Sequence, residues 1–143
     1  MYKRQLIGNA GILGKLTPLA HLDPKVFDDV MAVNVTANYR LIRSLDPLLR
    51  ASDAGRAVFV TSGLAYKCWA YWGSYSISKA ALEAMVRTYA AENGQTAIRA
   101  NCFSPGATRT KMRAQAMPGE DPETLPAAEE VAAQVIPMCL PAF

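Results

Sequence analysis

Three side chains near the middle of the sequence have types and spacings that suit acid-base chemistry. Ser62 follows the apolar run at residues 57–60, and Tyr75 and Lys79 come shortly after it. A spacing of four residues places Tyr75 and Lys79 on one face of a helix, one turn apart. These three residues are therefore the first candidates for a catalytic site.

The proposed chemistry depends on the phenol of Tyr75. A tyrosine has a pKa of about 10 in water, whereas a general acid or base works best when its pKa lies near the operating pH. We expect the ammonium of Lys79 to lower the pKa of Tyr75, because a nearby positive charge favours the phenolate. We expect Ser62 to donate a hydrogen bond to the same carbonyl oxygen that Tyr75 protonates. A Y-x-x-x-K pair alone is common on solvated helix faces, so this hypothesis depends on the other residues.

The composition limits the classes of partner. Of the 143 residues 51% are hydrophobic and 19% are charged, and no apolar run approaches the ~18 residues that span a bilayer. The net charge of +3 includes Lys3 and Arg4, so we expect neither a nucleic acid nor a membrane partner. Cys68, Cys102 and Cys139 are too few and too scattered for a disulfide framework or a metal site, which favours a cytoplasmic protein without a metal.

The first five residues differ in character from the rest of the chain. The sequence M-Y-K-R-Q reads like the translated end of an adapter, and we interpret residues 1–5 as a cloning or assembly scar. On this interpretation residues 6–143 are a fragment of a longer protein.

The remaining chain alternates between strand and helix patterns. Apolar runs predict strands that begin at residue 6 and cover residues 57–60 and 98–103, and the second is typical of a strand buried on both faces. With right-handed crossovers this order predicts an α/β fold: a partial, Rossmann-like, doubly wound parallel sheet of about three strands with helices on both faces. Ligands bind such sheets at the carboxyl ends of the strands, where Asn9, Ser62 and Pro105 are found.

Helical patterns occupy three segments, at residues 24–49, residues 73–93 and from residue 126 onward. Pro47 suggests a kink or interruption near the end of the first helix. The polar, proline-rich residues 107–126 are typical of a mobile connection.

Two features remain open at this level. Asn34 falls on the apolar stripe of the first helix, and because a buried amide needs partners it is either a structural anchor or the holder of a water molecule. The loop before Tyr75 is dense in aromatic side chains, which either wall an apolar pocket or pack under the loop; we favour the pocket. These side chains are Tyr66, Trp69, Tyr71 and Trp72.

Five sequence elements together resemble the classical type of the short-chain dehydrogenase/reductase family, over essentially all of residues 6–143. They are N-A-G at Asn9, Ala10 and Gly11; Asn34 within V-N-V; Ser62, thirteen residues before the tyrosine; Y-x-x-x-K at Tyr75 and Lys79; and P-G-x-x-x-T at Pro105, Gly106 and Thr110. They occur in the order and at the spacing of the family.

The resemblance implies a role for each element. Tyr75 would be the acid/base, and Lys79 would lower its pKa and bind the nicotinamide ribose. Ser62 would polarise the substrate oxygen, and Asn34 would hold a water molecule in the proton relay. The cofactor would be NAD or NADP, bound by Asn9, Ala10, Gly11, Tyr75, Lys79, Pro105, Gly106 and Thr110. The resemblance also implies a small-molecule carbonyl or alcohol substrate and a homo-oligomer formed through the two long helices.

The sequence departs from the family pattern in two ways. Gly8 replaces the first Asn of the commoner N-N-A-G, for which we expect only a local loss of hydrogen bonding. The glycine-rich turn that holds the pyrophosphate, the charged residue after the second strand and the final strand of the family do not occur in the sequence. We therefore expect residues 6–143 to be the C-terminal part of a single Rossmann-like domain, compatible with either NAD or NADP.

The sequence thus predicts an NAD(P)-dependent oxidoreductase that transfers hydride between nicotinamide and a carbonyl or alcohol, and we expect the free fragment to be inactive. One alternative is a catalytically silent cofactor-binding or scaffold protein of the same fold, against which the complete set of Ser62, Tyr75 and Lys79 argues. Another is an extended-type epimerase or dehydratase, which shares Y-x-x-x-K. The N-A-G and P-G-x-x-x-T elements fit the classical branch better.

Overall fold

A sheet of three parallel strands forms the centre of the structure, a computed structural model that describes residues 5–143. The strands are β1 (Gln5–Gly8), β2 (Arg56–Val60) and β3 (Arg99–Phe103), in the order β1-β2-β3. Their register pairs Leu6 with Ala57 and Phe59 with Cys102. The predicted α/β class is confirmed. Gln5, which we assigned to the scar, is the first residue of β1, and residues 1–4 lie outside the described residues.

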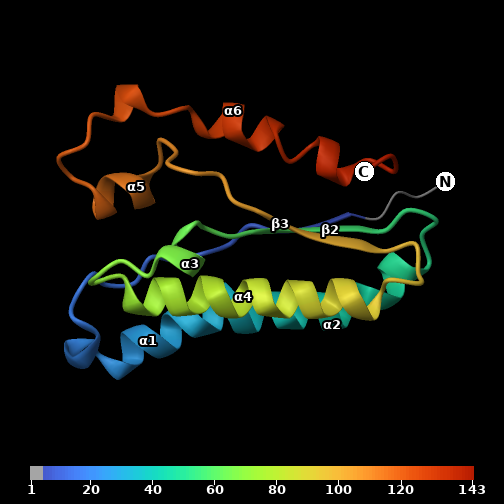
Figure 1. The fold of residues 1–143 in the computed structure, drawn as a ribbon, viewed down its shortest axis with the longest axis horizontal. Helices are drawn as coiled ribbons and strands as arrows, with labels where there is room; N and C mark the ends of the chain where they lie inside the picture. The colour runs from blue at the N-terminus through green and yellow to red at the C-terminus, as the bar shows by residue number, and fades with distance from the viewer. Residues whose placement is uncertain (1–4) are drawn as a thin grey trace.

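The long helices cover one face of the sheet, and the C-terminal segment covers the other (Figure 1). On the first face lie α1 (Pro24–Met31), α2 (Ala37–Arg50) and α4 (Gly73–Glu92). On the second face lie α5 (Lys111–Ala116) and α6 (Ala128–Ala133). The short helix α3 (Leu64–Lys67) follows β2, and single 3-10 turns occupy Leu19–His21, Pro122–Thr124 and Pro137–Cys139. Because the strands follow one another across the sheet, right-handed crossovers place α2 and α4 on the same face.

The interruption of the first long helix does not lie where the sequence placed it. α2 continues through Pro47 to Arg50, so the expected interruption near Pro47 is wrong. Leu49 in the same turn is buried in the core, which keeps the end of the helix on the sheet. The irregular segment is instead Ala32–Thr36, a π-helical turn between α1 and α2. Such turns are frequent at functional sites, and this one contains Asn34.

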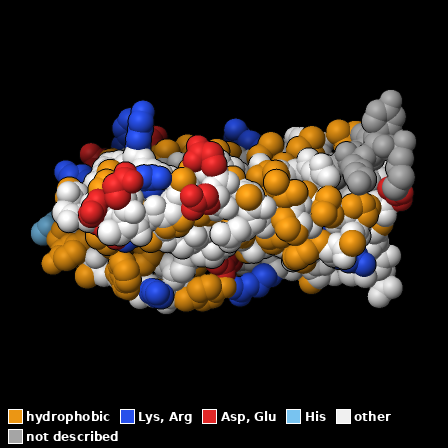
Figure 2. All heavy atoms as spheres, turned by 90° about the horizontal axis from the view of Figure 1, so that it is seen from above, with side chains coloured by type: hydrophobic (Ala, Val, Ile, Leu, Met, Phe, Trp, Pro, Cys, Tyr) orange, Lys and Arg blue, Asp and Glu red, His pale blue; other side chains and the backbone are white. Residues whose placement is uncertain are grey.

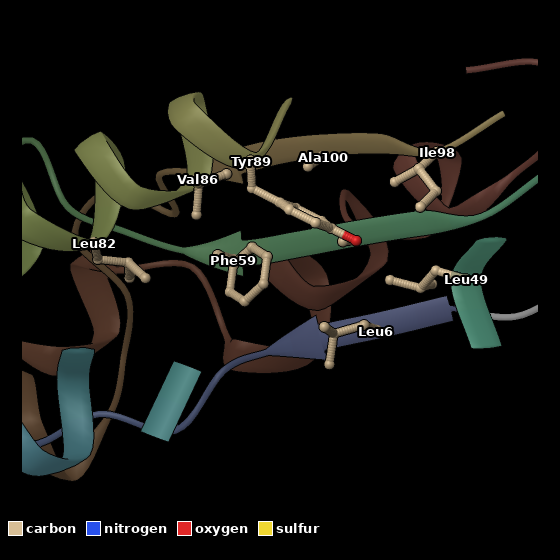
Figure 3. Packing of buried hydrophobic residues seen from close by; sticks show 9 residues of the cluster. Leu6, Leu49, Phe59, Leu82, Val86, Tyr89, Ile98 and Ala100 are labelled. Carbon is tan, nitrogen blue, oxygen red and sulfur yellow. The ribbon is translucent and has the colours of Figure 1, made fainter. Parts of the chain in front are cut away.

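The hydrophobic core lies between the sheet and the pair α2 and α4. Leu49 from α2 and Leu82 and Val86 from α4 are directed toward Phe59 of β2 (Figure 3). Phe59, like its neighbour Val58, is fully buried, which confirms the prediction of a strand covered on both faces. Each such side chain contributes roughly 1.5–3 kcal/mol through its burial.

Gly8 at the end of β1 is held in close packing. A Cβ added at this position would overlap the ring of Phe59 and the side-chain oxygen of Asn38. The structure therefore leaves no space for a side chain at this position, and the packing of Gly8 against Phe59 and Asn38 requires a glycine here.

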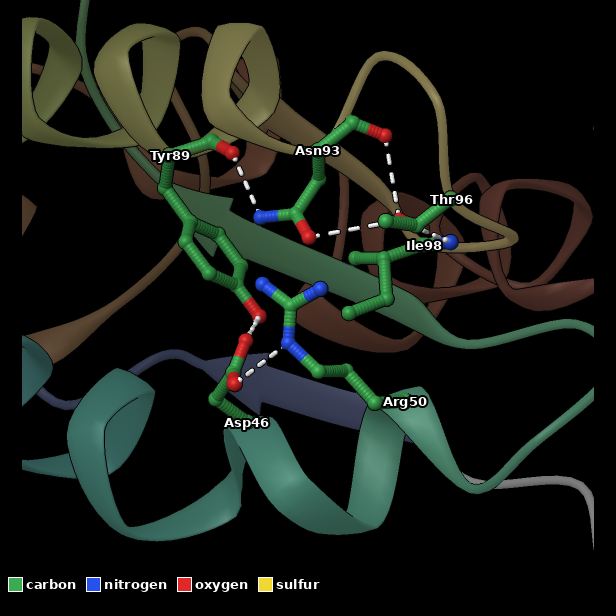
Figure 4. Close-up of polar contacts among 6 residues, drawn as sticks. All are labelled: Asp46, Arg50, Tyr89, Asn93, Thr96 and Ile98. Atoms are coloured by element: carbon green, nitrogen blue, oxygen red, sulfur yellow. Dashed lines mark hydrogen bonds and ion pairs between the residues drawn. The ribbon is translucent and has the colours of Figure 1, made fainter.

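A polar cluster joins the last turns of α2 and α4 (Figure 4). The Tyr89 hydroxyl donates to Asp46 Oδ1 at 2.8 Å, and Arg50 Nε donates to Asp46 Oδ2 at 2.7 Å. Burial opposes ionisation of Asp46, but hydrogen bonds from Arg50 and Tyr89 hold its pKa below the usual value. Burial, followed by the hydrogen bond to Asp46, raises the pKa of Tyr89.

Residues 107–126 have more regular structure than a mobile connection. Besides α5 they contain two ion pairs, in which Arg109 contacts Glu123 at 2.7 Å and Arg113 contacts Glu120 at 2.6 Å. The last helix begins at Ala128, two residues later than predicted. Figure 2 shows the face of the molecule that lies at the top of Figure 1. On this face charged side chains gather at one end of the molecule, and hydrophobic side chains extend toward the other end.

Candidate active site

The carboxyl ends of the three strands meet at one edge of the sheet, as the sequence predicted. A cavity of about 760 Å³ opens there. Asn9, Ser62 and Pro105, which follow β1, β2 and β3, all line it. The residues that the sequence singled out from distant segments therefore share one cavity.

Tyr75 and Lys79 project from the first two turns of α4 into this cavity. Both side chains are buried, and the Lys79 ammonium lies 5.7 Å from the centre of the Tyr75 ring. Lys79 Nζ also donates a hydrogen bond to the Val60 carbonyl at 2.8 Å. α4 thus brings the pair together one turn apart, and the pair is tied to the end of β2.

Burial dominates the electrostatics of the pair. It raises the pKa of Tyr75, and a hydrogen bond with Ser62 offsets only part of that effect. Burial also lowers the pKa of Lys79 to about 8. The net shift of the Tyr75 pKa is thus upward, because burial disfavours the phenolate more than the hydrogen bond with Ser62 favours it. The expected lowering of this pKa by Lys79 stays a prediction.

Ser62 lies at the junction between β2 and α3. Its hydroxyl oxygen accepts a hydrogen bond from the backbone N–H of Leu64 at 3.3 Å, which turns the chain into α3. Ser62 and Tyr75 both line the cavity, and Ser62 opposes the upward shift of the Tyr75 pKa. The serine and the tyrosine are therefore placed to contact one substrate oxygen.

Asn34 is a structural anchor in this structure. Its Oδ1 accepts from the Ile12 N–H at 2.8 Å, and its Nδ2 donates to the Ile12 carbonyl and to Ser78 Oγ, each at 2.9 Å. The side chain is fully buried, and these bonds connect the π-helical turn to the loop after β1 and to α4. Of the two alternatives left open by the sequence, the structure directly supports the anchor.

The remaining candidate residues form backbone-rich walls of the cavity. Asn9, Ala10, Gly11, Pro105, Gly106 and Thr110 all line it. A Cβ on Gly11 would lie 3.5 Å from both Lys79 Nζ and Asn34 Oδ1, so the bare backbone of Gly11 faces the catalytic candidates. Gly106 has a φ of 73°, a left-handed conformation that favours glycine. These exposed backbones and the Lys79 ammonium fit the flat ring and ribose of a nicotinamide.

The aromatic loop contributes one residue to the cavity. Trp72 lines it, with its ring centre 5.9 Å from that of Tyr75 in an edge-to-face arrangement. Tyr66, Trp69 and Tyr71 are exposed and do not line it. The predicted pocket wall is therefore right for Trp72 alone.

Several apolar residues of the cavity were not predicted from the sequence. They include Leu64, Met112, Ala116, Val131 and Val135. The spacing of four between Met112 and Ala116 was a signal for one helix face, but it lay in a segment interpreted as a connection.

Two properties of residues 5–143 bear on other classes of site. Within this range no group of His, Cys, Asp and Glu side chains is arranged to hold a metal ion. No helix in the same range is long and apolar enough to cross a membrane.

Comparison with known proteins identifies the family to which this fold and cavity belong. Residues 4–121 match the family described as short chain dehydrogenase, so the chain belongs to that family. It is 44% identical over 135 residues to the uncharacterized oxidoreductase YciK of Escherichia coli; the match covers 94% of this chain and 52% of that protein.

Solved structures show the same relationship. A short-chain dehydrogenase from Pseudomonas syringae superposes with a TM-score of 0.93 at 44% identity, covering 97% of this chain and 57% of that one. An Escherichia coli short-chain dehydrogenase in complex with NADPH superposes with a TM-score of 0.91 at 42% identity. The match covers 96% of this chain and 58% of that one. This chain therefore spans little more than half the length of these relatives.

Proposed function

We propose that the chain is the catalytic, C-terminal part of an NAD(P)-dependent oxidoreductase that interconverts a carbonyl and an alcohol. The observation that carries this proposal is the convergence of Ser62, Tyr75 and Lys79 on one cavity, whose walls combine the exposed backbone around Gly11 and Gly106 with apolar side chains. Such an activity belongs to a longer chain that also carries a glycine-rich half.

Each of these side chains has a different role in the reaction. Tyr75 donates its proton to that oxygen during reduction, and Ser62 donates a hydrogen bond that holds the oxygen in place. Burial raises the pKa of Tyr75, so the phenol is protonated near neutrality and available as the acid. Lys79 supplies positive charge beside the phenol and hydrogen bonds for a ribose. Asn34 fixes the loop after β1 and has the proposed role of holding a water molecule in the relay.

The nicotinamide cofactor supplies the hydride when bound. Its nicotinamide end fits against Gly11, Gly106 and Thr110, and its ribose against Lys79. The relative from Escherichia coli that was solved with NADPH supports NADPH as the cofactor.

The substrate side of the cavity is apolar. Trp72, Leu64 and Met112 lie around the Tyr75 end, which favours a carbonyl compound with an aromatic or branched apolar substituent.

Replacement of Tyr75 by Phe tests the reaction. In the intact enzyme we expect Tyr75→Phe to reduce kcat by at least ~100-fold, because general acid catalysis typically contributes 10²–10⁴-fold, while NADPH binding changes little. Activity would be followed by NADPH absorbance on a panel of carbonyl compounds, and binding by fluorescence titration. Tyr39→Phe, on an exposed tyrosine of α2, is the matched control. Unchanged turnover in Tyr75→Phe would refute the proposed reaction, and NADPH binding without turnover of any compound by the wild type would favour a silent scaffold.

Replacement of Trp72 tests the substrate class. We expect Trp72→Ala to raise KM for aromatic ketones by roughly 10–100-fold, because the wall that buries the substrate is removed. KM for small aliphatic aldehydes should rise much less. Tyr39→Ala, at an exposed aromatic residue of α2 that does not line the cavity, should leave KM for both classes unchanged. An equal rise in KM for aromatic and aliphatic substrates would contradict this role of Trp72.

Two further properties are proposed for the intact protein. Exposed apolar side chains on the long helices, such as Leu48 on α2 and Ile77 on α4, support a homo-oligomer formed through this helix pair. The cysteines, which are all free among the described residues, support a reducing cytoplasm as the compartment.

A further inference from the structure

Glu83 is a buried carboxylate beside the candidate site to which none of the roles above refers. It follows Tyr75 by eight residues and Lys79 by four, so the three side chains share one face of α4. Glu83 is only 4% exposed. Burying a carboxylate is costly unless hydrogen bonds compensate it, so its partners are expected to be well defined.

The partners of Glu83 lie on both sides of Ser62 in the sequence. Glu83 Oε1 accepts a hydrogen bond from Thr61 Oγ1 at 2.8 Å, and Thr61 directly precedes Ser62. Glu83 Oε2 accepts from the hydroxyl of Tyr66, which belongs to α3, and from Arg87 Nη2 at 2.6 Å. One carboxylate therefore holds the residue before the serine and the helix that follows it.

The end of β2 is held by a second contact from the same helix face. Lys79 Nζ donates to the Val60 carbonyl at 2.8 Å, one residue before Thr61. The Thr61 N–H in turn donates to the Phe103 carbonyl of β3 at 2.8 Å. Consecutive residues at the carboxyl end of β2 are thus fixed to α4 and to β3, directly before Ser62.

We propose that Glu83 is a positioning residue for the reaction: through Thr61 and Tyr66 it holds the hydroxyl of Ser62 where the substrate oxygen and Tyr75 require it. This inference rests on the proposed function. A hydrogen-bond donor loses much of its catalytic effect when it is displaced by about 1 Å. A buried polar network in which every group is hydrogen-bonded resists such displacement. The buried carboxylate of Glu83 would therefore contribute to catalysis as well as to stability.

The polar cluster around Asp46 provides a matched comparison. Asp46 also accepts a hydrogen bond from a tyrosine of α4, Tyr89, and pairs with an arginine four residues away, Arg50. Asp46 does not line the cavity. Substitution there measures the effect of a weakened network on stability alone.

The test uses Thr61→Val, which keeps the shape of the side chain and removes its hydrogen bond to Glu83. In the intact enzyme we expect kcat to fall by about tenfold, with KM for substrate and NADPH changing by less than about threefold. Glu83→Gln should lower kcat in the same way, and Thr61→Ser, which retains the hydroxyl, should restore it. In a Ser62→Ala background Thr61→Val should have no further effect on kcat, because both substitutions act through the same hydroxyl.

Three kinetic outcomes would overturn the proposal. They are a kcat within about twofold of wild type in Thr61→Val, an undiminished effect in the Ser62→Ala background, or an equal loss of kcat in the control Asp46→Asn. A crystal structure of Thr61→Val gives a readout that does not depend on turnover. A displaced Ser62 hydroxyl supports the positioning role, and an unmoved one refutes it. A wild-type enzyme that reduces no carbonyl compound refutes the proposed function instead, and the crystal structure still decides the role of Glu83.

Discussion

Tyr75 and Lys79 show how burial sets the properties of individual side chains. An exposed Y-x-x-x-K pair would keep ordinary pKa values, but here the phenol is harder to ionise and the ammonium is easier to deprotonate. Both shifts come first from desolvation, which disfavours the charged form of either group. The site therefore holds a protonated phenol beside a lysine whose charge is costly for the folded state.

The stability of Lys79→Met should reveal this cost. The pKa of Lys79 is about 8 in the folded state, against an ordinary value of 10.5. Between these values the unfolded chain binds more protons, so the free energy of unfolding of the wild type rises with pH. We expect Lys79→Met to be more stable than wild type at pH 7 by about 1–3 kcal/mol, after the lost hydrogen bond to Val60 is allowed for.

The measurement is urea denaturation at a series of pH values. The advantage of Lys79→Met should shrink as pH rises from 8 to 10.5. Lys111→Met, at an exposed lysine of α5, should follow the wild type throughout. A difference between wild type and Lys79→Met that is independent of pH would show that the lysine is not desolvated in the folded state.

At the scale of elements, the site depends on how β1 and its following loop meet the helix pair. The π-helical turn at Ala32–Thr36 places Asn34 against the loop after β1, and the packing of Gly8 sets how closely β1 approaches α2 and β2. Strand, loop and helix therefore reach the cavity as one packed unit.

Gly8→Ala should disturb this unit. The added methyl group would overlap Phe59 and Asn38, and overpacking of this kind typically costs about 1–3 kcal/mol. The free energy of unfolding from urea denaturation measures the loss. Gly119→Ala is the control, because nothing lies within 4 Å of a Cβ at Gly119. Equal stability of Gly8→Ala and wild type would mean that β1 lies further from α2 than the structure shows.

At the scale of the whole molecule, the sheet has an open side. Among residues 5–143, β1 pairs with β2 alone, and Ile7 on β1 is half exposed. An open edge with an apolar side chain is a template for association with other chains.

We expect the 143-residue chain to associate with increasing concentration, and Ile7→Lys to reduce that association because a charge on an edge strand opposes strand pairing. Light scattering across a concentration series measures the effect. Ile136→Lys, at an exposed isoleucine outside the sheet, is the control. If Ile136→Lys suppressed association as strongly as Ile7→Lys, general hydrophobicity and not the strand edge would be responsible.

The positions of the site residues were largely predictable from the sequence. Local apolar runs determine β2 and β3, the spacing of four determines the pairing of Tyr75 and Lys79, and parallel strands bring Asn9, Ser62 and Pro105 to one edge. These features follow from local patterns and from the handedness of the crossovers.

Only the tertiary structure decided the environment of those residues. The pKa of Tyr75, the anchoring role of Asn34, the single aromatic wall at Trp72 and the contact between Glu83 and Thr61 all depend on segments that are distant in the sequence. Burial and hydrogen bonding are set by what packs around a side chain. A local pattern therefore determines which residues reach the site, and the packing of distant segments determines their protonation and their precise placement.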